Sequence, residues 1–418
     1  MNLFNINPNI LNIAETVESQ LKSEFEKIDG ITQTNQQRVL AAFINNRVSE
    51  SHFAATTGYG YDDRGRDNLD RVLAEIFGTD DGLIRHSFAS GTHTITVALF
   101  GLLRPGDRVL IVTGTPYDTL MPVLGVKNTP GSLKEFGIDI DIVPLDDSGG
   151  VDCNAVESHL RRNNYAMVYI QRSRGYTLRP SLSAANCGDI ARQAKSIQPN
   201  TVVFTDNCYG EFAETAEPTA CGVDVMAGSL IKNPGGGIVR CGGYIVGRAD
   251  LVEQCAFRMT APGVGREVGA SLGMNRELYM GLFNAPHITG EALKAAVFAA
   301  ALFEHMGYDV SPGPSEPRRD IIQSITLKDP QRLQAFCQGL QSGAPIDSYV
   351  TPAPWNMPGY DDKVIMSTGA FTSGASIELS ADGPMRPPYA AWLQGALNYH
   401  SAKVGIMLAA QAVLDIRL

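Results

Sequence analysis

Apolar side chains recur at helical spacing through the first part of the chain. The spacing covers residues 10–27 and returns over residues 36–46. We therefore expect an N-terminal helical arm over residues 1–50. A loop rich in glycine and tyrosine follows at residues 57–66, and the pattern over residues 67–77 predicts a further helix.

From residue 81 onward, short apolar runs alternate with stretches of helical spacing. Strands are predicted over residues 108–113, 138–143, 166–171, 201–205, 226–230 and 243–246, and helices over residues 91–102, 155–162 and 187–196. This alternation is typical of the α/β class, with a mostly parallel sheet covered by helices. Ligands bind such sheets at the carboxyl ends of the strands, so the residues that follow the strands are candidate site residues.

The last third of the chain predicts a second, smaller unit. Helices are predicted over residues 266–283, 291–305, 330–341 and 389–414, and strands over residues 321–327, 364–367 and 376–379. Pro286 separates the first two helices, and proline commonly ends a helix. We therefore predict a large domain over residues 51–285 and a smaller α+β domain over residues 286–418.

Composition and charge narrow the functional classes. The 418 residues are 44% hydrophobic and 19% charged, with a formal net charge of −10. An acidic chain argues against nucleic acid as the main partner, because binding a phosphate backbone requires a basic face. The first residues lack the pattern of a signal peptide, and the longest apolar stretch is too short to cross a bilayer, so we expect no membrane partner.

Cysteine and histidine usage argues against disulfides and metal sites. The seven cysteines form no Cys-x-x-Cys pair and are odd in number. Free thiols in a reducing cytoplasm are the expected state. The seven histidines show no spacing typical of ligands, so we expect no metal.

Two residues that follow apolar runs suggest covalent cofactor chemistry. Asp206 follows the predicted strand 201–205, and Lys232 lies between Leu230-Ile231 and a run of one proline and three glycines. Enzymes that use pyridoxal phosphate (PLP) need a lysine that forms a Schiff base with the cofactor and a carboxylate that keeps its pyridine nitrogen protonated. A lysine in an apolar cleft beside a cationic imine system would also have a lowered pKa. A surface lysine and a turn aspartate are the alternative interpretation.

Other residues are candidates for holding such a cofactor. Ser90, Gly91 and Thr92 precede a predicted helix, where backbone N–H groups and the helix dipole favour a phosphate. An ordinary serine-capped helix is the commoner alternative. Ser229 could add a hydrogen bond to the phosphate, and Tyr209 could donate to the phenolic oxygen of the cofactor.

An aromatic residue and a charged loop extend this set. Tyr117 follows a strand and is placed to stack on a planar ring, unless it only packs within its own turn. Tyr61 and Arg66 share a glycine-rich loop in which an arginine could bind phosphate or carboxylate, and a solvated charged loop is the alternative. Arg386, held between prolines, could bind a substrate carboxylate or form a structural salt bridge.

Several longer strings resemble a known family. They are Gly58-Tyr59-Gly60-Tyr61-Asp62-Asp63, Ser90-Gly91-Thr92-His93, Ile170 through Tyr176, Asp206-Asn207-Cys208-Tyr209-Gly210-Glu211-Phe212, Ser229 through Gly237, and Gly374 through Arg386. They look like the methionine γ-lyase-like proteins, which are also described as aluminium resistance proteins or cystathionine β-lyases. The resemblance extends from about residue 10 to the end of the chain.

The resemblance implies a fold type I PLP enzyme of the Cys/Met metabolism group. It implies a dimer or tetramer whose active sites are shared between subunits. Lys232 then corresponds to the Schiff-base lysine and Asp206 to the partner of the pyridine nitrogen. Tyr117 corresponds to the stacking aromatic residue, and Gly91 with Thr92 to the phosphate cup.

Other parts of the resemblance concern the substrate and a second subunit. Tyr61 and Arg66 match a loop that reaches the cofactor phosphate of a neighbouring subunit, and Arg386 matches a carboxylate-binding arginine more loosely. Residues 366–371 and Ser373 depart from the family pattern. Because these positions could line the substrate, they leave the choice of substrate open.

The chain is therefore expected to be a PLP-dependent carbon–sulfur lyase. It would carry out β- or γ-elimination on an amino acid such as cystathionine, methionine or cysteine. A PLP-dependent aminotransferase or aldolase is the alternative within the same chemistry. A PLP-binding protein without turnover is the alternative from a different class.

Overall fold

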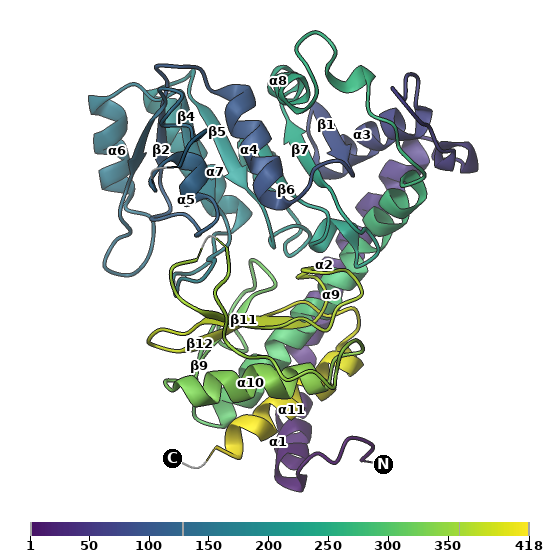
Figure 1. Cartoon of the computed structure of the whole chain (residues 1–418), viewed down its shortest axis with the longest axis vertical. Helices are drawn as coiled ribbons and strands as arrows, with labels where there is room; N and C mark the ends of the chain where they lie inside the picture. Colours follow the sequence, from purple (N-terminus) through teal and green to yellow (C-terminus); the bar gives the residue numbers. More distant parts are fainter. Residues whose placement is uncertain (1, 128, 359, 417–418) are drawn as a thin grey trace.

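Two β-sheets organise the chain in the computed structural model, which describes residues 2–127, 129–358 and 360–416. Figure 1 shows the larger sheet and its helices in one half and the smaller sheet in the other. The larger sheet contains β1 (Asp81–Arg85), β2 (Arg108–Ile111), β3 (Asp139–Ile142), β4 (Met167–Gln171), β5 (Val202–Asp206), β6 (Val225–Ser229) and β7 (Gly243–Gly247).

The larger sheet is mostly parallel, as predicted. Its strand order is β1-β7-β6-β5-β4-β2-β3, and the pairs from β6 through β3 are all parallel. β7 is antiparallel to both of its neighbours and closes one edge together with β1. The parallel strands therefore end at a common edge, where the residues that follow β4, β5 and β6 lie next to one another.

Helices cover both faces of this sheet. They are α3 (Arg64–Phe77), α4 (Gly91–Leu102), α5 (Met121–Leu124), α6 (Cys153–Arg162), α7 (Ala184–Ile197) and α8 (Ala249–Met259). Successive residues of a strand point to opposite faces. Accordingly, Phe204 packs in the core under α4 and α8, whereas its neighbour Val203 packs in the core under α6 and α7.

One long helix, α9 (Asn275–His305), connects the two halves. The sequence predicted a break at Pro286, and this prediction is wrong because α9 continues through that residue. Proline removes one backbone hydrogen bond, but Pro286 is buried and α2 (Lys22–Asn45) packs along α9. Tertiary packing thus offsets the local cost, and the predicted domain boundary falls inside a continuous helix.

The smaller sheet is antiparallel, in the order β10-β11-β12-β9-β8. Its strands are β8 (Asp309–Ser311), β9 (Gln323–Thr326), β10 (Val364–Ser367), β11 (Ser380–Pro384) and β12 (Ala390–Gln394). The remaining helices are α1 (Pro8–Gln20), α10 (Pro330–Ser342) and α11 (Tyr399–Leu414). The N-terminal arm contributes Ile10, Ala14 and Val17 to the core of this half.

The structure corrects two elements predicted in this half. A helix was predicted over residues 389–414, but residues 390–394 form the buried strand β12 between β9 and β11. Gly395, with φ 75°, ends that strand, and α11 begins only after its cap residue Asn398. The strand predicted over residues 376–379 begins four residues later, at Ser380. Among the described residues, no helix is both long and apolar enough to cross a membrane.

Candidate active site

A cavity of about 290 Å³ lies where the two halves meet. One wall comes from the residues at the carboxyl ends of the parallel strands, including Gln171, Asp206 and Ser229. The opposite wall comes from the smaller sheet, including Asp382 on β11 and Trp392 on β12. The cavity thus lies at the edge of the sheet where ligands of α/β proteins bind.

Lys232 and Asp206 line this cavity together, as the sequence predicted. Asp206 is the last residue of β5, and Lys232 lies three positions beyond the end of β6. The two oxygens of Asp206 accept from the Cys208 backbone N–H at 3.1 Å and from the Tyr169 hydroxyl at 3.4 Å. These contacts fix the orientation of the carboxylate toward the cavity.

The segment around Lys232 is held in place by its neighbours. The Asn233 side chain donates to the carbonyl oxygens of Tyr209, at 3.0 Å, and Glu211, at 2.9 Å. A Cβ atom at Gly235 would lie 1.6 Å from the Leu230 carbonyl oxygen, so the turn after the lysine requires glycine there. The glycine run therefore serves to position Lys232.

Charges around Lys232 and Asp206 shift both of their pKa values. Burial raises the pKa of the Asp206 carboxyl, and the Lys232 ammonium opposes that rise. Burial also opposes the charge on Lys232, but Cys208, Tyr209 and Asp206 raise the pKa of its amine well above the ordinary value. Among the protein's own side chains the nearby acidic groups therefore outweigh burial, and the lowering of the Lys232 pKa expected beside a cationic imine stays a prediction.

The start of α4 and the end of β6 form a small polar pocket within the cavity. The Ser90 hydroxyl caps α4 by accepting from the His93 backbone N–H at 3.0 Å. Gly91 and Thr92 form the first turn, and the Ser229 hydroxyl is buried without a hydrogen-bond partner among the described residues. A Cβ at Gly91 would lie 3.2 Å from that of Ser229. This arrangement fits a phosphate group, which would bind the helix N-terminus and supply the missing partner of Ser229.

Two tyrosines complete the wall around Lys232. The Nζ atom of Lys232 lies 3.8 Å from the centroid of the Tyr209 ring, and the Ser376 hydroxyl donates to the Tyr209 hydroxyl at 3.4 Å. Tyr117 also lines the cavity, and its backbone N–H donates to the Gln171 side chain at 3.1 Å. Burial raises the pKa of the Tyr117 phenol well above its ordinary value, so this phenol is neutral at physiological pH.

Three predicted residues lie outside the residues that line the cavity. Arg386 pairs with Asp362 at 2.8 Å in the turn after β11, and its role in binding a substrate carboxylate stays a prediction. Arg66 donates to the carbonyl oxygens of Gly60 and Gly269. Tyr61 is 61% exposed. A role of Arg66 or Tyr61 in a neighbouring subunit stays a prediction.

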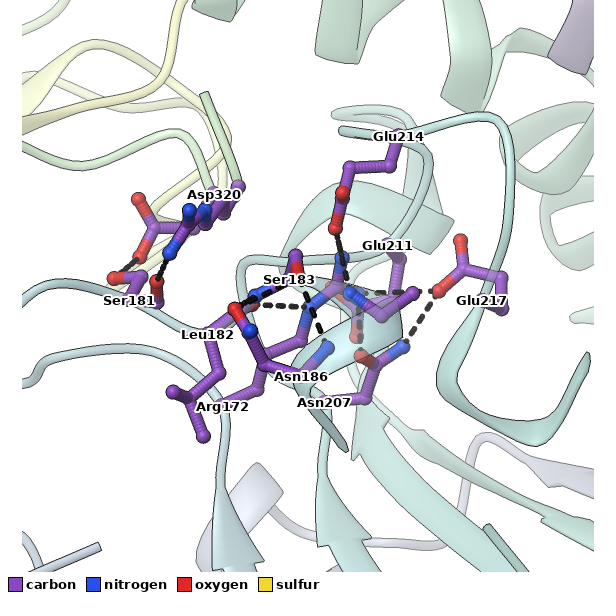
Figure 2. A network of polar contacts seen from close by, with 12 residues as sticks. Arg172, Ser181, Leu182, Ser183, Asn186, Asn207, Glu211, Glu214, Glu217 and Asp320 are labelled. Carbon is purple, nitrogen blue, oxygen red and sulfur yellow. Dashed lines mark hydrogen bonds and ion pairs between the residues drawn. The ribbon is translucent and has the colours of Figure 1, made fainter. Parts of the chain in front are cut away.

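A network of polar contacts joins Arg172 to Asn207, the residue that follows Asp206 (Figure 2). The Arg172 guanidinium is fully buried and donates to Asn207, at 2.7 Å, Glu217, at 3.2 Å, and Glu214, at 2.6 Å. Because Asn207 directly follows Asp206, this network fixes the segment that carries the carboxylate. In the sequence, Arg172 stood out only as part of a string that resembles the family.

Only part of the wall opposite Lys232 was predicted from the sequence: residues 366–371 were expected to line the substrate, and Met366 and Thr368 line the cavity. The remainder includes the acid Asp382 on β11, Trp392 on β12 and Tyr360, and Tyr176 from the loop after β4 lies beside Trp392. Burial raises the pKa of the Asp382 carboxyl to about 7. The sequence signal that could have indicated this acid is Asp382 itself, which is the one acidic residue in the run of small residues 380–384.

Comparisons with known proteins find relatives that match nearly the whole chain. The family model described as methionine gamma-lyase matches residues 10–414. The uncharacterized protein YnbB of Bacillus subtilis is 47% identical over 407 residues, which cover 97% of this chain and 96% of that protein.

Solved structures give the same result. A carbon-sulfur lyase involved in aluminum resistance from Clostridium novyi NT is 46% identical, with a TM-score of 0.94 and coverage of 97% of this chain and 96% of that chain. A Bacillus cereus protein is 50% identical, with a TM-score of 0.94 and coverage of 98% and 100%. The pyridoxal-5'-phosphate dependent protein YhfS from Escherichia coli, at 16% identity and a TM-score of 0.63 over 93% of this chain and 97% of that chain, shares the fold alone.

These matches confirm the resemblance inferred from the motifs, and they confirm the fold type I architecture. They extend from the N-terminal arm through the last helix, so both walls of the cavity fall within the matched region. The chain belongs to the methionine gamma-lyase family of enzymes.

Proposed function

We propose that the protein is a PLP-dependent carbon–sulfur lyase that acts on a sulfur-containing amino acid. The observation that carries this proposal is that Lys232 and Asp206 line one cavity together with the start of α4. The description of the Clostridium novyi relative as a carbon-sulfur lyase supports the same activity. When bound, PLP would supply a ring that draws electrons from the α-carbon of the substrate.

The residues of one wall suit the parts of this cofactor. Lys232 is the amine for covalent attachment, and Asp206 is the carboxylate for the pyridine nitrogen. The phosphate would bind the backbone N–H groups at Gly91 and Thr92 and the hydroxyl of Ser229. Tyr117 would supply the aromatic face for stacking.

The same residues can move the protons that elimination requires. The Lys232 amine would take the proton from the α-carbon of the substrate, and Asp206 would hold a proton on the ring nitrogen. Tyr117 keeps its phenolic proton because burial raises its pKa, so its hydroxyl would stabilise the departing sulfur by donating a hydrogen bond without transferring the proton. Loss of the sulfur group leaves an unsaturated amine, which water converts to a keto acid and ammonia.

Self-association and location belong to this proposal as well. We infer a dimer or tetramer in which Tyr61 and Arg66 complete the phosphate site of a neighbouring subunit. The exposed rings of Tyr59 and Tyr61, with centroids 5.5 Å apart, support a contact there. The seven free cysteines support a cytoplasmic location, since disulfides are rare in that compartment.

A substrate panel tests the function. The purified protein is supplied with PLP and incubated with cystathionine, methionine or cysteine, and keto acid, ammonia and free thiol are measured. A lyase releases keto acid and ammonia in equal amounts. Keto acid without ammonia, formed only with an amino-group acceptor, would make the protein an aminotransferase, and PLP binding without any product would make it a binding protein.

A further inference from the structure

One buried acid near Lys232 takes no part in the proposed chemistry. Glu211 lies five positions after the end of β5, is fully buried and lies outside the residues that line the cavity. Its Oε1 atom accepts from the Tyr244 hydroxyl at 2.8 Å, and its Oε2 atom has no hydrogen-bond partner among the described residues. The carboxyl group is therefore enclosed by protein with one oxygen unpaired.

The neighbouring acid Glu217 has the partners that compensate a buried negative charge. The Arg172 guanidinium donates to Glu217 at 3.2 Å. The Asn207 side chain and the Phe212 backbone N–H also donate to it, at 3.1 Å and 2.8 Å. Glu211 has no ion-pair partner in the described part of the chain. A buried carboxylate without a paired cation is costly, so the geometry favours a proton on Glu211.

The titratable groups around Glu211 act in both directions. Burial raises the pKa of the Glu211 carboxyl to about 8, where the hydrogen bond from Tyr244 opposes the rise, Glu217 adds to it and Lys232 opposes it. The Cys208 thiol also feels the charge of Glu211. Burial raises the pKa of Cys208 and of Tyr244 well above their ordinary values, so both groups stay neutral. Glu211 is therefore expected to change its charge near pH 8.

The backbone of Glu211 is tied to the segment that carries Lys232. The Glu211 carbonyl oxygen accepts from the Asn233 side chain at 2.9 Å, and Asn233 directly follows Lys232. The Oδ1 atom of Asn233 is itself buried without a donor among the described residues. A proton on Glu211 would thus add a donor to a part of the protein in which two acceptors lack one.

The other contact of Glu211 leads to the segment that carries Asp206. The Tyr244 hydroxyl that donates to Glu211 accepts from the Asn207 side chain at 3.4 Å, and Asn207 directly follows Asp206. A Cβ at Gly228 would lie 2.5 Å from Oε1 of Glu211 and 2.6 Å from the Tyr244 ring. Glycine at this position of β6 therefore allows the acid to pack behind the strand that leads to the lysine.

We propose that Glu211 is a positioning residue that carries a proton in the folded protein and acts through Lys232. A neutral Glu211 adds no negative charge behind the lysine, so the amine loses its proton more readily than it would beside an ionised acid. Loss of the Glu211 proton makes the amine hold its own proton more tightly. The inference rests on the proposed function, because that function requires Lys232 to attach the cofactor and to move protons.

Infrared spectroscopy over a range of pH tests the proton on Glu211 directly. A protonated carboxyl and a carboxylate absorb at different frequencies, so the spectra follow each buried acid as it ionises. The wild type, with or without PLP, is expected to lose a protonated-carboxyl band with a midpoint near pH 8. Glu211→Gln should lack this band and keep the band of Asp382, whose pKa burial raises to about 7. Glu157→Gln, which changes an exposed acid of α6, should keep both bands.

The absorbance of lysine-bound PLP tests the effect on Lys232. This band reports whether the nitrogen that joins Lys232 to PLP carries a proton. In Glu211→Gln that proton should be lost at a lower pH than in the wild type, by about 0.5 to 1 pH unit, because the ionised acid is missing. Glu157→Gln should leave the midpoint unchanged. A residue with a structural role alone would not move this midpoint.

Tyr244→Phe carries the test if Glu211→Gln does not fold. Phenylalanine keeps the ring that stacks on Phe77 and removes the hydroxyl that donates to Oε1 of Glu211. That hydrogen bond favours the ionised acid, so its loss should move the infrared midpoint of Glu211 to higher pH, by up to about one pH unit. An unchanged or lower midpoint would contradict a proton held at this site.

Three outcomes would overturn the proposal. An infrared difference between wild type and Glu211→Gln that contains only a carboxylate band would mean that Glu211 is ionised. Equal midpoints for lysine-bound PLP in these two proteins would mean that Glu211 does not act through Lys232. Absence of lysine-bound PLP from the wild type would remove the proposed function and this role together, and the infrared band would still report the proton on Glu211.

Discussion

The amine of Lys232 lies against the face of the Tyr209 ring, with Nζ 3.8 Å from the ring centroid. Tyr209 has a positive φ of 74°, and the Asn233 side chain bonds to its carbonyl oxygen at 3.0 Å. Asn233, which directly follows Lys232, therefore holds Tyr209 against the lysine amine. A positive charge over an aromatic face is stabilised, so the contact keeps the amine inside the cavity.

Replacement of Lys232 should abolish the proposed chemistry. Lys232→Ala removes both the attachment point and the base, and general acid–base transfer alone contributes about 10²- to 10⁴-fold. We expect the absorbance band of lysine-bound PLP to disappear and turnover to fall by at least that factor. Lys328→Ala, an exposed lysine of the smaller half, serves as the control. Retention of the absorbance band in Lys232→Ala would assign the attachment to another residue.

Replacement of Ser229 should affect the cofactor and not the fold. Its hydroxyl is buried and has no partner in the described part of the chain, so Ser229→Ala leaves no protein group unsatisfied. We expect an unchanged or slightly higher free energy of unfolding and about a 10-fold weaker affinity for PLP. Urea unfolding without PLP and a titration with PLP measure the two effects. A large loss of stability with normal PLP affinity would contradict the assignment.

Replacement of Arg172 should destabilise the protein strongly. Arg172→Met leaves Glu217 and Glu214 without their ion-pair partner, and breaking a buried pair in this way costs about 3–5 kcal/mol. Arg161→Met breaks the exposed pair with Glu157 and should cost less than about 1 kcal/mol. Urea unfolding of both variants provides the comparison, and similar losses for the two would contradict a structural role of the network in Figure 2.

Asp382 on β11 should make the free energy of unfolding depend on pH. Burial raises the pKa of Asp382 to about 7, against an opposing effect of Tyr176, Gln394 and Lys232. The folded protein therefore holds this proton more tightly than the unfolded chain, and the stability that this provides is lost as pH rises from about 4 through 7. A tenfold difference in proton affinity between the folded and unfolded chain corresponds to about 1.4 kcal/mol of stability.

Asp382→Asn removes this titration. We expect the variant to gain stability relative to the wild type between pH 5 and pH 8, by an amount on the order of a few kcal/mol. Urea unfolding at several pH values measures the difference, and Asp362→Asn serves as the exposed control. A constant difference across this range would show that the carboxyl is ionised throughout.

The cavity wall that carries Lys232 could be predicted because most of its residues lie at the ends of predicted strands or at the start of a predicted helix. An apolar run that ends in a polar residue, as at Asp206, places that residue at the ligand-binding edge of a parallel sheet. Lys232 and Ser229 were found in the same way, from the run that forms β6. For these three residues, the apolar pattern of the neighbouring segment and the fold class were sufficient to predict a place in the cavity.

The opposite wall depends on contacts between distant segments. The apolar run at residues 390–394 is compatible with a helix or a buried strand, and only pairing with β9 and β11 decides for a strand. The cavity position of Asp382 follows from that pairing, which no local pattern specifies. Arg386 was predicted to bind a substrate carboxylate from its stiff loop and more loosely from the resemblance, and the structure pairs it with Asp362 in the turn after β11. Pro286 likewise lies inside a helix, although proline usually ends one, because α2 packs along α9.

The two walls come from different sheets, more than a hundred residues apart in the chain for Lys232 and Asp382. Mutation can therefore change the part of the cavity that β11 and β12 line while the proposed cofactor residues on the other sheet stay intact. Relatives of this chain can share one reaction and still consume different metabolites. A lysine at the position of Lys232 is then by itself insufficient to infer the substrate of such a relative.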